Sequence, residues 1–180
     1  MEDIIKIPRD RIAVLIGTKG TKRRQLERIT QCKISVDSHD GDVTLSGDPV
    51  DIYNTIPVIK AISRGFNPEI AEELLKEDII LHIVDMKEFI GKNKNAIARI
   101  RSRIIGSKGK CRRTIEAMTN CKISIYGKSV GIIGELEMAE IAKEAVENIL
   151  RGSIHSNVYA WIDSKKKKLL KDHYENKEKP

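Results

Sequence analysis

The chain has 180 residues, with 33 lysines and arginines against 26 aspartates and glutamates and a formal net charge of +7 at pH 7. A hydrophobic content of 40% can fill one large core or two small ones, and no apolar run approaches the length of a membrane span. Residues 1–4 place no basic region ahead of an apolar segment, so no secretory signal is evident. We therefore expect a soluble cytoplasmic protein.

Hydrophobic periodicity in residues 4–64 predicts a strand, two helices, two strands and a helix. Leu26 and Ile29 should face inward from the second helix. Asp48 is the N-cap candidate of the third helix, and Pro49 fits its first turn. These six elements are expected, in order, at residues 4–7, 8–16, 21–30, 33–36, 43–46 and 49–64.

A second series of elements begins at residue 79, after a segment at residues 67–76 that resembles a short capped helix. Residues 153–175 should form a C-terminal helix that docks through Val158, Trp161 and Ile162. The elements of the second series are expected at residues 79–84, 110–119, 122–126, 130–133 and 135–150. The apolar face of the last of these helices is predicted from Leu136, Ala139, Ala142, Val146 and Ile149.

The two series are copies of one unit. Gly17 and Gly106 stand 89 positions apart, and the same offset still holds at residues 32–35 and 121–124. After a shorter loop in the second copy the offset drops to 87, where Gly47 matches Gly134. A match on both sides of one small deletion indicates a duplicated fold.

Basic charge is concentrated around the glycine segment of the second copy. Residues 87–113 contain ten lysines and arginines against one acid, Glu88, while acids gather at residues 69–77 and 135–147. Such segregation creates an electropositive face and indicates a polyanionic partner. The ten basic residues are Lys87, Lys92, Lys94, Arg99, Arg101, Arg103, Lys108, Lys110, Arg112 and Arg113.

The glycine segments at residues 16–20 and 105–109 suit a phosphate ligand. Glycine at both ends of a four-residue loop lets a ligand approach the backbone, and the amides that open the next helix favour an anion. Lys19 and Lys108 lie inside the loops. The spacing is not that of a Walker loop, and a helix precedes the first glycine, which excludes the dinucleotide-binding motif.

Cysteine and histidine usage indicates no metal site. Cys32, Cys111 and Cys121 are an odd number without metal-ligand spacing, and the four histidines are scattered without repeat equivalents. We expect Cys32 and Cys121 to be buried, reduced thiols. The sequence predicts no disulfide framework, metal or cofactor.

The loops and the order of elements around them resemble KH domains, whose GXXG loop clamps single-stranded nucleic acid. The resemblance implies an α+β fold of two tandem type I KH domains, each a three-stranded antiparallel sheet packed on three helices, with a C-terminal helical extension. The implied parts are a first KH domain, a helical linker, a second KH domain, and a C-terminal helix with a basic tail, at residues 3–66, 67–77, 78–153 and 154–180.

In KH domains, the strand after the second helix forms one wall of a narrow apolar groove in which bases lie. By that resemblance Ile34 and Ile123 would line the groove, with Ile16 and Ile105 at its floor. A plain core role for these isoleucines remains an open alternative.

At two positions, both copies differ from the usual KH pattern, and these differences narrow the resemblance to one KH family. Arg23 and Arg112 stand at the third position after the loop, where an aliphatic residue is usual, and Gln31 and Asn120 replace a glycine before the second strand. With the basic stretch and the runs at residues 64–69 and 152–159, they are similar to the Partner-of-Nob-one family, also called Dim2, of small-subunit ribosome assembly factors. The intact first loop and the lack of a long N-terminal extension resemble archaeal members.

The family resemblance implies binding near the 3′ end of precursor small-subunit ribosomal RNA. There such a protein assists or regulates the maturation endonuclease Nob one. Archaeal members are also linked to the alpha subunit of translation initiation factor two. We therefore expect an RNA-binding protein with these two protein partners.

We expect the second unit to be the principal RNA-binding site because the basic stretch surrounds its loop. The first unit would bind RNA more weakly or bind protein. The candidate residues of the second unit are Gly106, Ser107, Lys108, Gly109, Lys110, Arg112, Arg113, Arg99, Arg101, Arg103, Ile105 and Ile123. Those of the first unit are Gly17, Thr18, Lys19, Gly20, Lys22, Arg23, Arg24, Ile16 and Ile34.

Two other functions compete with this interpretation. A general KH-type regulator of messenger or small RNA explains the loops equally well, but it does not explain the family-like runs. An enzyme is disfavoured because residues 89–115 contain no acid to hold Mg²⁺ or act as a base. Aromatic residues make up 4% of the chain without the spacing of a stacking platform, which disfavours RRM and OB-type binders.

Overall fold

The structure of the chain is a computed structural model that describes residues 1–90 and 94–177. The backbone divides into two compact units, Met1–Leu81 and His82–Pro180. Lys92 of the basic stretch lies outside the described residues. Over the described ranges, no helix is long and apolar enough to cross a membrane.

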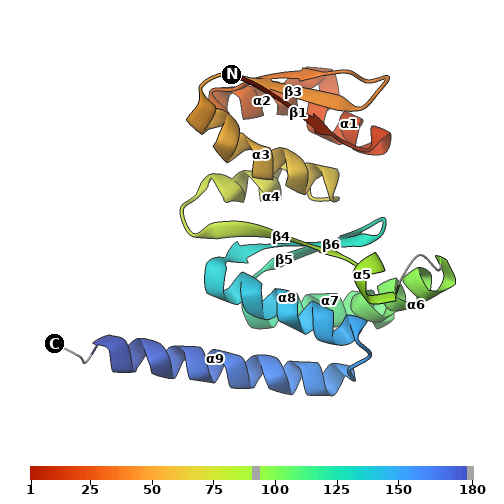
Figure 1. Cartoon of the computed structure of the whole chain (residues 1–180), viewed down its shortest axis with the longest axis vertical. Helices are drawn as coiled ribbons and strands as arrows, with labels where there is room; N and C mark the ends of the chain where they lie inside the picture. Colours follow the sequence, from red (N-terminus) through yellow and green to blue (C-terminus); the bar gives the residue numbers. More distant parts are fainter. Residues whose placement is uncertain (91–93, 178–180) are drawn as a thin grey trace. The chain divides into compact units, whose positions relative to one another are not determined.

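The first unit contains a three-stranded antiparallel sheet covered by helices (Figure 1). Its strands β1 (Glu2–Lys6), β2 (Lys33–Val36) and β3 (Asp42–Ser46) lie in the order β1–β3–β2. Opposite its two neighbours, β3 pairs Val43 with Ile5 and Leu45 with Ile34. The other elements are α1 (Arg9–Ile16), the 3-10 turn η1 (Thr18–Gly20), α2 (Thr21–Thr30), α3 (Pro49–Ser63), α4 (Pro68–Ala71) and the 3-10 turn η2 (Glu72–Leu75).

The second sheet repeats this topology. Its strands β4 (Ile79–Asp85), β5 (Lys122–Tyr126) and β6 (Ser129–Glu135) lie in the order β4–β6–β5. The helical elements are α5 (Lys87–Ile90), α6 (Lys94–Ile105), η3 (Ser107–Gly109), α7 (Lys110–Thr119), α8 (Leu136–Leu150) and α9 (His155–Lys177). In Figure 1, α7 and α8 cover one face of this sheet and α9 lies on their far side. The predicted α+β fold with a C-terminal helix is confirmed.

Local sequence explains where α3 begins and ends. The Asp48 side chain accepts a hydrogen bond from the Val50 amide at 2.9 Å, and Pro49 occupies the first helical position. Gly65 follows the last turn with φ of +98°, a conformation that glycine adopts without strain. The predicted capping residue is therefore confirmed.

Two residues predicted to face inward are exposed. Ile29 is 45% exposed on α2, where Leu26 and Thr30 are buried instead. The Thr30 hydroxyl donates to the Leu26 carbonyl at 2.8 Å, so this polar side chain is satisfied within the helix and tolerates burial. Leu136 is 53% exposed because it is the first residue of α8, and the buried face of that helix begins at Ala139.

Each unit carries a further helical segment that packs near the helix after the glycine loop. The segments α4 and α9 begin at positions related by the same 87-residue offset as the preceding helices. Gln25 on α2 donates to Glu72 at 2.9 Å. The repeat-equivalent positions in the second unit are Thr114 on α7 and Tyr159 on α9. The duplicated unit therefore includes this fourth segment.

The longer segment, α9, docks through apolar and cationic side chains. Val158 and Ile162 are buried, as the sequence predicts, while Trp161 is partly exposed. The Lys165 Nζ lies 5.2 Å from the centre of the Trp161 ring, within cation–π range. Lys166 donates to the Met118 carbonyl at the end of α7, at 2.5 Å. These contacts hold α9 against α7 and α8.

All three cysteines are buried and carry free thiols. Burial raises the pKa of Cys111 and of Cys121, so both remain neutral and pack as small apolar groups. Burial and a hydrogen bond with the Cys111 thiol raise the pKa of Tyr159 to about 12. The predicted burial of Cys32 and Cys121 is confirmed.

Candidate nucleic-acid interface

The two glycine loops have the same backbone conformation. Gly17 and Gly106 have φ of +68° and +74°, with ψ of 175° in both. Lys19 and Lys108 have φ of +52° and +50°, the left-handed region that non-glycine residues occupy at a cost in free energy. Both copies keep this strained turn, which indicates that the loop shape serves a ligand.

The two glycines of each loop are needed for different reasons. A Cβ on Gly106 would lie 2.7 Å from the Cβ of Cys111, and one on Gly17 would lie 2.6 Å from the nearest side-chain atom. The first glycine therefore allows the next helix to pack closely. A Cβ on Gly20 or Gly109 would meet no atom within 4 Å. The space in front of the second glycine is open to a ligand backbone.

The loops direct hydrogen-bond donors and positive charge into that space. Each loop leads into a helix, α2 or α7, whose first turn contains no acidic residue. Amides at a helix N-terminus lack intrahelical partners and attract anions. Lys108 and Lys110 are exposed at the second loop. A phosphodiester in front of Gly109 would therefore meet backbone amides and two ammonium groups.

In each unit a hollow lies between the helix that precedes the glycine loop and the turn of the following hairpin; we call it the helix–turn hollow. An apolar floor with a cationic rim suits a base flanked by phosphates. In the second unit the hollow has a volume of about 260 Å³ and is lined by Lys94, Ile97, Ala98, Arg101, Gly127 and Lys128. In the first unit its volume is about 390 Å³ and its lining is Arg9, Ile12, Ala13, Ile16, Gly17 and Ser38.

Sequence reasoning missed Lys128 as a candidate because it lies outside the basic stretch. The residue follows Gly127 in the turn between β5 and β6, where the two copies differ in length. The repeat predicted the position of this turn, but not which of its side chains line the hollow. The difference in turn length between the two copies was the signal that could have drawn attention to Lys128.

The isoleucines expected in the groove divide into two kinds. Ile34 and Ile123 are 1% and 4% exposed, so their side chains belong to the core. Ile16 and Ile105, which directly precede the loops, are partly exposed. A plain core role, which the sequence left open, therefore holds for Ile34 and Ile123. Ile16 instead lines the helix–turn hollow of its unit.

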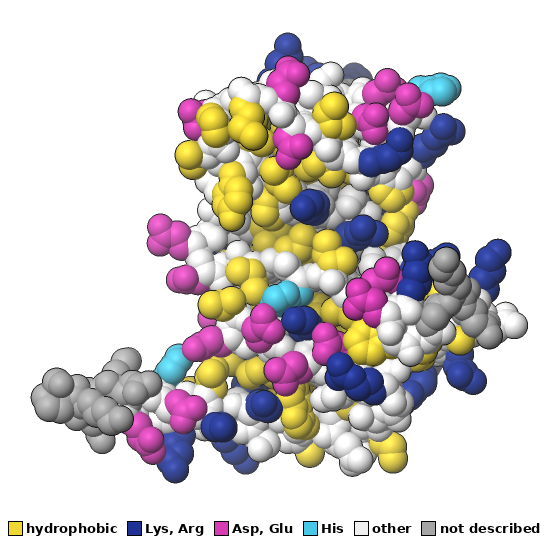
Figure 2. Space-filling model, in the orientation of Figure 1, with side chains coloured by type: hydrophobic (Ala, Val, Ile, Leu, Met, Phe, Trp, Pro, Cys, Tyr) yellow, Lys and Arg dark blue, Asp and Glu magenta, His cyan; other side chains and the backbone are white. Residues whose placement is uncertain are grey.

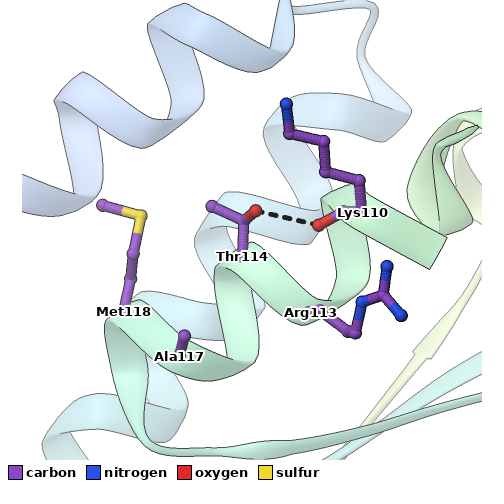
Figure 3. A pocket seen from close by; sticks show the side chains of 5 residues that line it. All are labelled: Lys110, Arg113, Thr114, Ala117 and Met118. Carbon is purple, nitrogen blue, oxygen red and sulfur yellow. Dashed lines mark hydrogen bonds between the residues drawn. The ribbon is translucent and has the colours of Figure 1, made fainter. Parts of the chain in front are cut away.

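Most predicted cations of the second unit are accessible. Arg99, Arg101 and Arg113 are exposed. Figure 2 shows basic side chains gathered over α6 and acidic ones over α8. Lys110 and Arg113 also line a hollow of about 370 Å³ on α7 (Figure 3), together with Thr114, Ala117 and Met118. The basic surface therefore continues from the loop along α7.

Arg103 differs from the other predicted cations. Its guanidinium donates to the carbonyls of Ile149 and Ser153, at 3.3 and 2.7 Å. In the first unit, Arg11 donates to the two repeat-equivalent carbonyls, at 2.8 and 2.6 Å. Both arginines close the C-terminal end of the last KH helix. Two of the five N–H donors of Arg103 are engaged in this way, which leaves fewer for a phosphate. That Arg103 extends the phosphate-binding track stays a prediction.

The cations near the first loop are partly neutralised. Lys22 forms an ion pair with Glu69 of α4, and its ammonium lowers the pKa of that carboxyl. Arg24 donates to the Lys19 carbonyl at 2.9 Å. The repeat equivalent of Lys22 is Cys111, a buried thiol that needs no such partner. The first loop therefore presents less free positive charge than the second.

A glutamate on the helix after the loop makes the same hydrogen bond in both units. Glu27 accepts a hydrogen bond from the Ile34 amide at 2.9 Å, and Glu116 accepts one from the Ile123 amide at 2.8 Å. The Arg112 Nε lies 3.7 Å from the second oxygen of Glu116. Each glutamate therefore ties the helix after the loop to the edge strand of its sheet, next to the unusual arginine.

Comparison with known families agrees with this geometry. Residues 2–61 match the family model described as a KH domain. Residues 80–167 match the model for the second KH domain of Partner of Nob one, described as a eukaryotic type KH-domain (KH-domain type I). Neither model describes an enzyme, and within residues 1–90 and 94–177 no group of three His, Cys, Asp or Glu side chains is arranged to hold a metal ion. Fold and loops define a tandem KH-domain protein of the RNA-binding class.

Individual relatives narrow the class. A KH domain-containing protein of Methanocaldococcus jannaschii is 39% identical over 178 residues, which cover 96% of this chain and 78% of that protein. The crystal structure of Dim2p from Pyrococcus horikoshii is 42% identical, covers 91% of this chain and 99% of its own, and has a TM-score of 0.85. The chain belongs to the Dim2 (Partner of Nob one) family. A crystal structure from the same organism, an a/eIF2alpha–aDim2p–rRNA complex, matches with 42% identity, coverage of 93% and 95%, and a TM-score of 0.86.

Proposed function

We propose that this protein is a ribosome assembly factor that binds single-stranded RNA near the 3′ end of precursor small-subunit ribosomal RNA. There it assists or regulates the endonuclease of the Nob-one family that matures this end. One observation carries the proposal: the chain is 42% identical, over 93% of its length, to a chain of the complex that contains Dim2p and ribosomal RNA. The two intact glycine loops give this protein the means to hold such an RNA.

The second KH unit supplies the main RNA contacts in this proposal. Lys108 in its loop and Lys110 directly after it are exposed, and the helix–turn hollow of this unit carries the cations Lys94, Arg101 and Lys128 on its rim. A strand of RNA would place phosphates at the loop and a base over Ile97 and Ala98 in the hollow. The first unit adds a weaker contact because Glu69 neutralises Lys22 beside its loop.

Protein partners would meet other faces of the molecule. The alpha subunit of translation initiation factor two is a candidate partner because the related complex includes it. The endonuclease partner follows from the family resemblance. The acidic side of α8 is the face that we assign to protein contacts, because it is poorly suited to RNA. Its exposed Glu137 and Glu144 lie 3.1 and 3.8 Å from His173 and Lys165 of α9, so a partner at this face would meet acids and bases together.

Crosslinking of the tagged protein to RNA in cells, followed by sequencing of the bound sites, tests the proposal. We expect a dominant peak near the 3′ end of precursor small-subunit ribosomal RNA. Crosslinks spread over messenger or small RNAs would favour the alternative function, a general KH-type regulator. Metal-dependent cleavage of RNA by the purified protein would contradict the assignment of a binding protein without enzymatic activity.

A further inference from the structure

Arg23 and Arg112 each hold a hydrogen-bond donor without a partner. The Nε of each side chain is shielded from solvent and makes no hydrogen bond within residues 1–90 and 94–177. Buried donors in proteins are almost always paired, so each exception needs a physical explanation. The same atom is unpaired at the same position in two copies that have otherwise diverged. This coincidence points to a ligand that supplies the missing acceptor.

The nearest carboxylate does not supply that acceptor. In the second unit, the Glu116 oxygen that faces Arg112 lies 3.7 Å from the Nε, which is too far for a hydrogen bond. The other oxygen of Glu116 accepts the Ile123 amide at 2.8 Å. The glutamate therefore balances the charge of the guanidinium, but it accepts no hydrogen bond from its Nε.

The arginine of the first unit lines a hollow at the open edge of a strand; we call it the strand-edge hollow. Its volume is about 510 Å³, and its walls include Arg23 and Glu27 of α2 and Ile34 of β2. The strand β2 is an edge strand, so its outward amides have no strand partner. Glu27 already accepts the Ile34 amide, at 2.9 Å. A base that enters this hollow therefore meets the guanidinium instead of that strand amide.

We propose that Arg23 and Arg112 determine base specificity and that each reads a guanine in single-stranded RNA. The planar fork of an arginine matches two neighbouring acceptors, and guanine presents this pair at O6 and N7. Glu27 and Glu116 occupy the strand amide, and Glu116 is in addition a positioning residue for Arg112. The proposal rests on the proposed function, because it requires RNA to lie in the KH groove.

The test compares the full-length protein with variants that restore the usual aliphatic residue, Arg23→Ile and Arg112→Ile. Each protein selects from a pool of random single-stranded RNA decamers, and the retained RNA is sequenced. We expect the wild type to enrich guanine at a fixed position for each unit, and each variant to lose the guanine that its own unit selects. Thermal unfolding of each variant checks that it is folded.

A second measurement isolates the contact to N7. We expect 7-deazaguanosine at the selected position to weaken binding to the wild type about 5- to 150-fold, the equivalent of about 1–3 kcal/mol for a bidentate pair. The same RNA should bind the Arg112→Ile variant nearly as well as its guanosine parent. The conservative variant Arg112→Lys should bind guanosine less selectively, because a lysine has no planar fork.

The neighbouring exposed Arg113 provides the matched control. Arg113→Ile should weaken all RNAs alike and flatten the log–log salt dependence by about 0.7, as loss of a phosphate contact does. If Arg112→Ile behaves in the same way, its arginine is a phosphate contact and the proposal is overturned. Enrichment of cytosine, or of no base, by the wild type would also overturn it. A wild-type protein that retains no RNA would contradict the proposed function itself.

Discussion

The two glycine loops of this protein share one backbone and differ in their surroundings. In both, the third residue is a lysine with φ near +50°, and the first glycine is too close to the next helix for a side chain. At the second position after the first loop, Lys22 is paired with Glu69; at the same position after the second loop, Cys111 is buried. Duplication has preserved the shape that admits a phosphate and has changed the charge around it.

The contrast between the loops indicates what determines the RNA affinity of a KH unit. The loop conformation follows from glycine chemistry and is therefore hard to vary. The free positive charge around the loop depends on neighbouring side chains, which vary at little structural cost. Two units with the same loop can accordingly bind the same polyanion with different strength.

The largest effect should come from placing acids in the loops. Ser107→Asp combined with Lys108→Asp should lower RNA affinity about 100-fold, because two carboxylates then face the phosphate. The matched pair Thr18→Asp with Lys19→Asp should lower it about tenfold or less. Fluorescence anisotropy at several salt concentrations measures both losses, and equal losses would contradict the ranking of the two units.

The next largest effect concerns the arginines that close the last KH helices. Arg103→Ala and Arg11→Ala should each lower the free energy of unfolding by about 1.5–3 kcal/mol, because a charged donor to two carbonyls is lost in each. Urea unfolding followed by circular dichroism measures the change. The salt dependence of RNA binding in Arg103→Ala tests the predicted phosphate contact. A slope flattened by about 0.7 would confirm that contact, and an unchanged slope would contradict it.

A smaller effect should appear where α2 and α7 end. Gln31 and Asn120 have φ of +58° and +53°, at the position where KH domains usually have glycine. Gln31→Gly should raise the free energy of unfolding by about 0.5–1 kcal/mol, because glutamine is strained in this conformation and glycine is not. Asn120→Gly should change it less, since asparagine tolerates the left-handed region. A larger gain at Asn120 would contradict this explanation.

The smallest effect concerns the ion pair beside the first loop. Glu69→Gln should raise the RNA affinity of the first unit about two- to threefold, because exposed ion pairs are worth little and only one cation is released. The measurement is made in the background of Ser107→Asp and Lys108→Asp, where the second loop no longer dominates binding. Exchange of Glu73, another acid of the same segment, for glutamine is the matched control. If both changes have the same effect, general charge is responsible and not the pair with Lys22.

Much of the fold could be predicted because its boundaries are set by local chemistry. The bounds predicted for α2, α7, β2 and β5 agree with the structure, since glycine loops, a left-handed residue and apolar alternation mark their ends. The candidate loops were found from the repeat alone. Local sequence does not show which side chains meet across the fold. In the sequence, Arg103 is one more cation in a basic stretch; only the structure shows that it donates to carbonyls at the end of α8.

The fourth helical segment was harder to recognise for a related reason. Gln25 donates to Glu72 in the first unit, whereas the equivalent positions of the second unit hold Thr114 and Tyr159, side chains of different chemistry. A comparison of residue types therefore shows no repeat there. Only the positions of the helices in space show that the two segments correspond.

That correspondence also orders events in the history of the gene. Because α4 and α9 start at equivalent positions and pack on the equivalent helices α3 and α8, we infer that the ancestral single module already carried this segment before it was copied. The greater length of α9 and the additional helix α5 distinguish the second copy from the first. The protein thus descends from a module larger than a bare KH domain, and each half inherited the additional helical segment, α4 or α9.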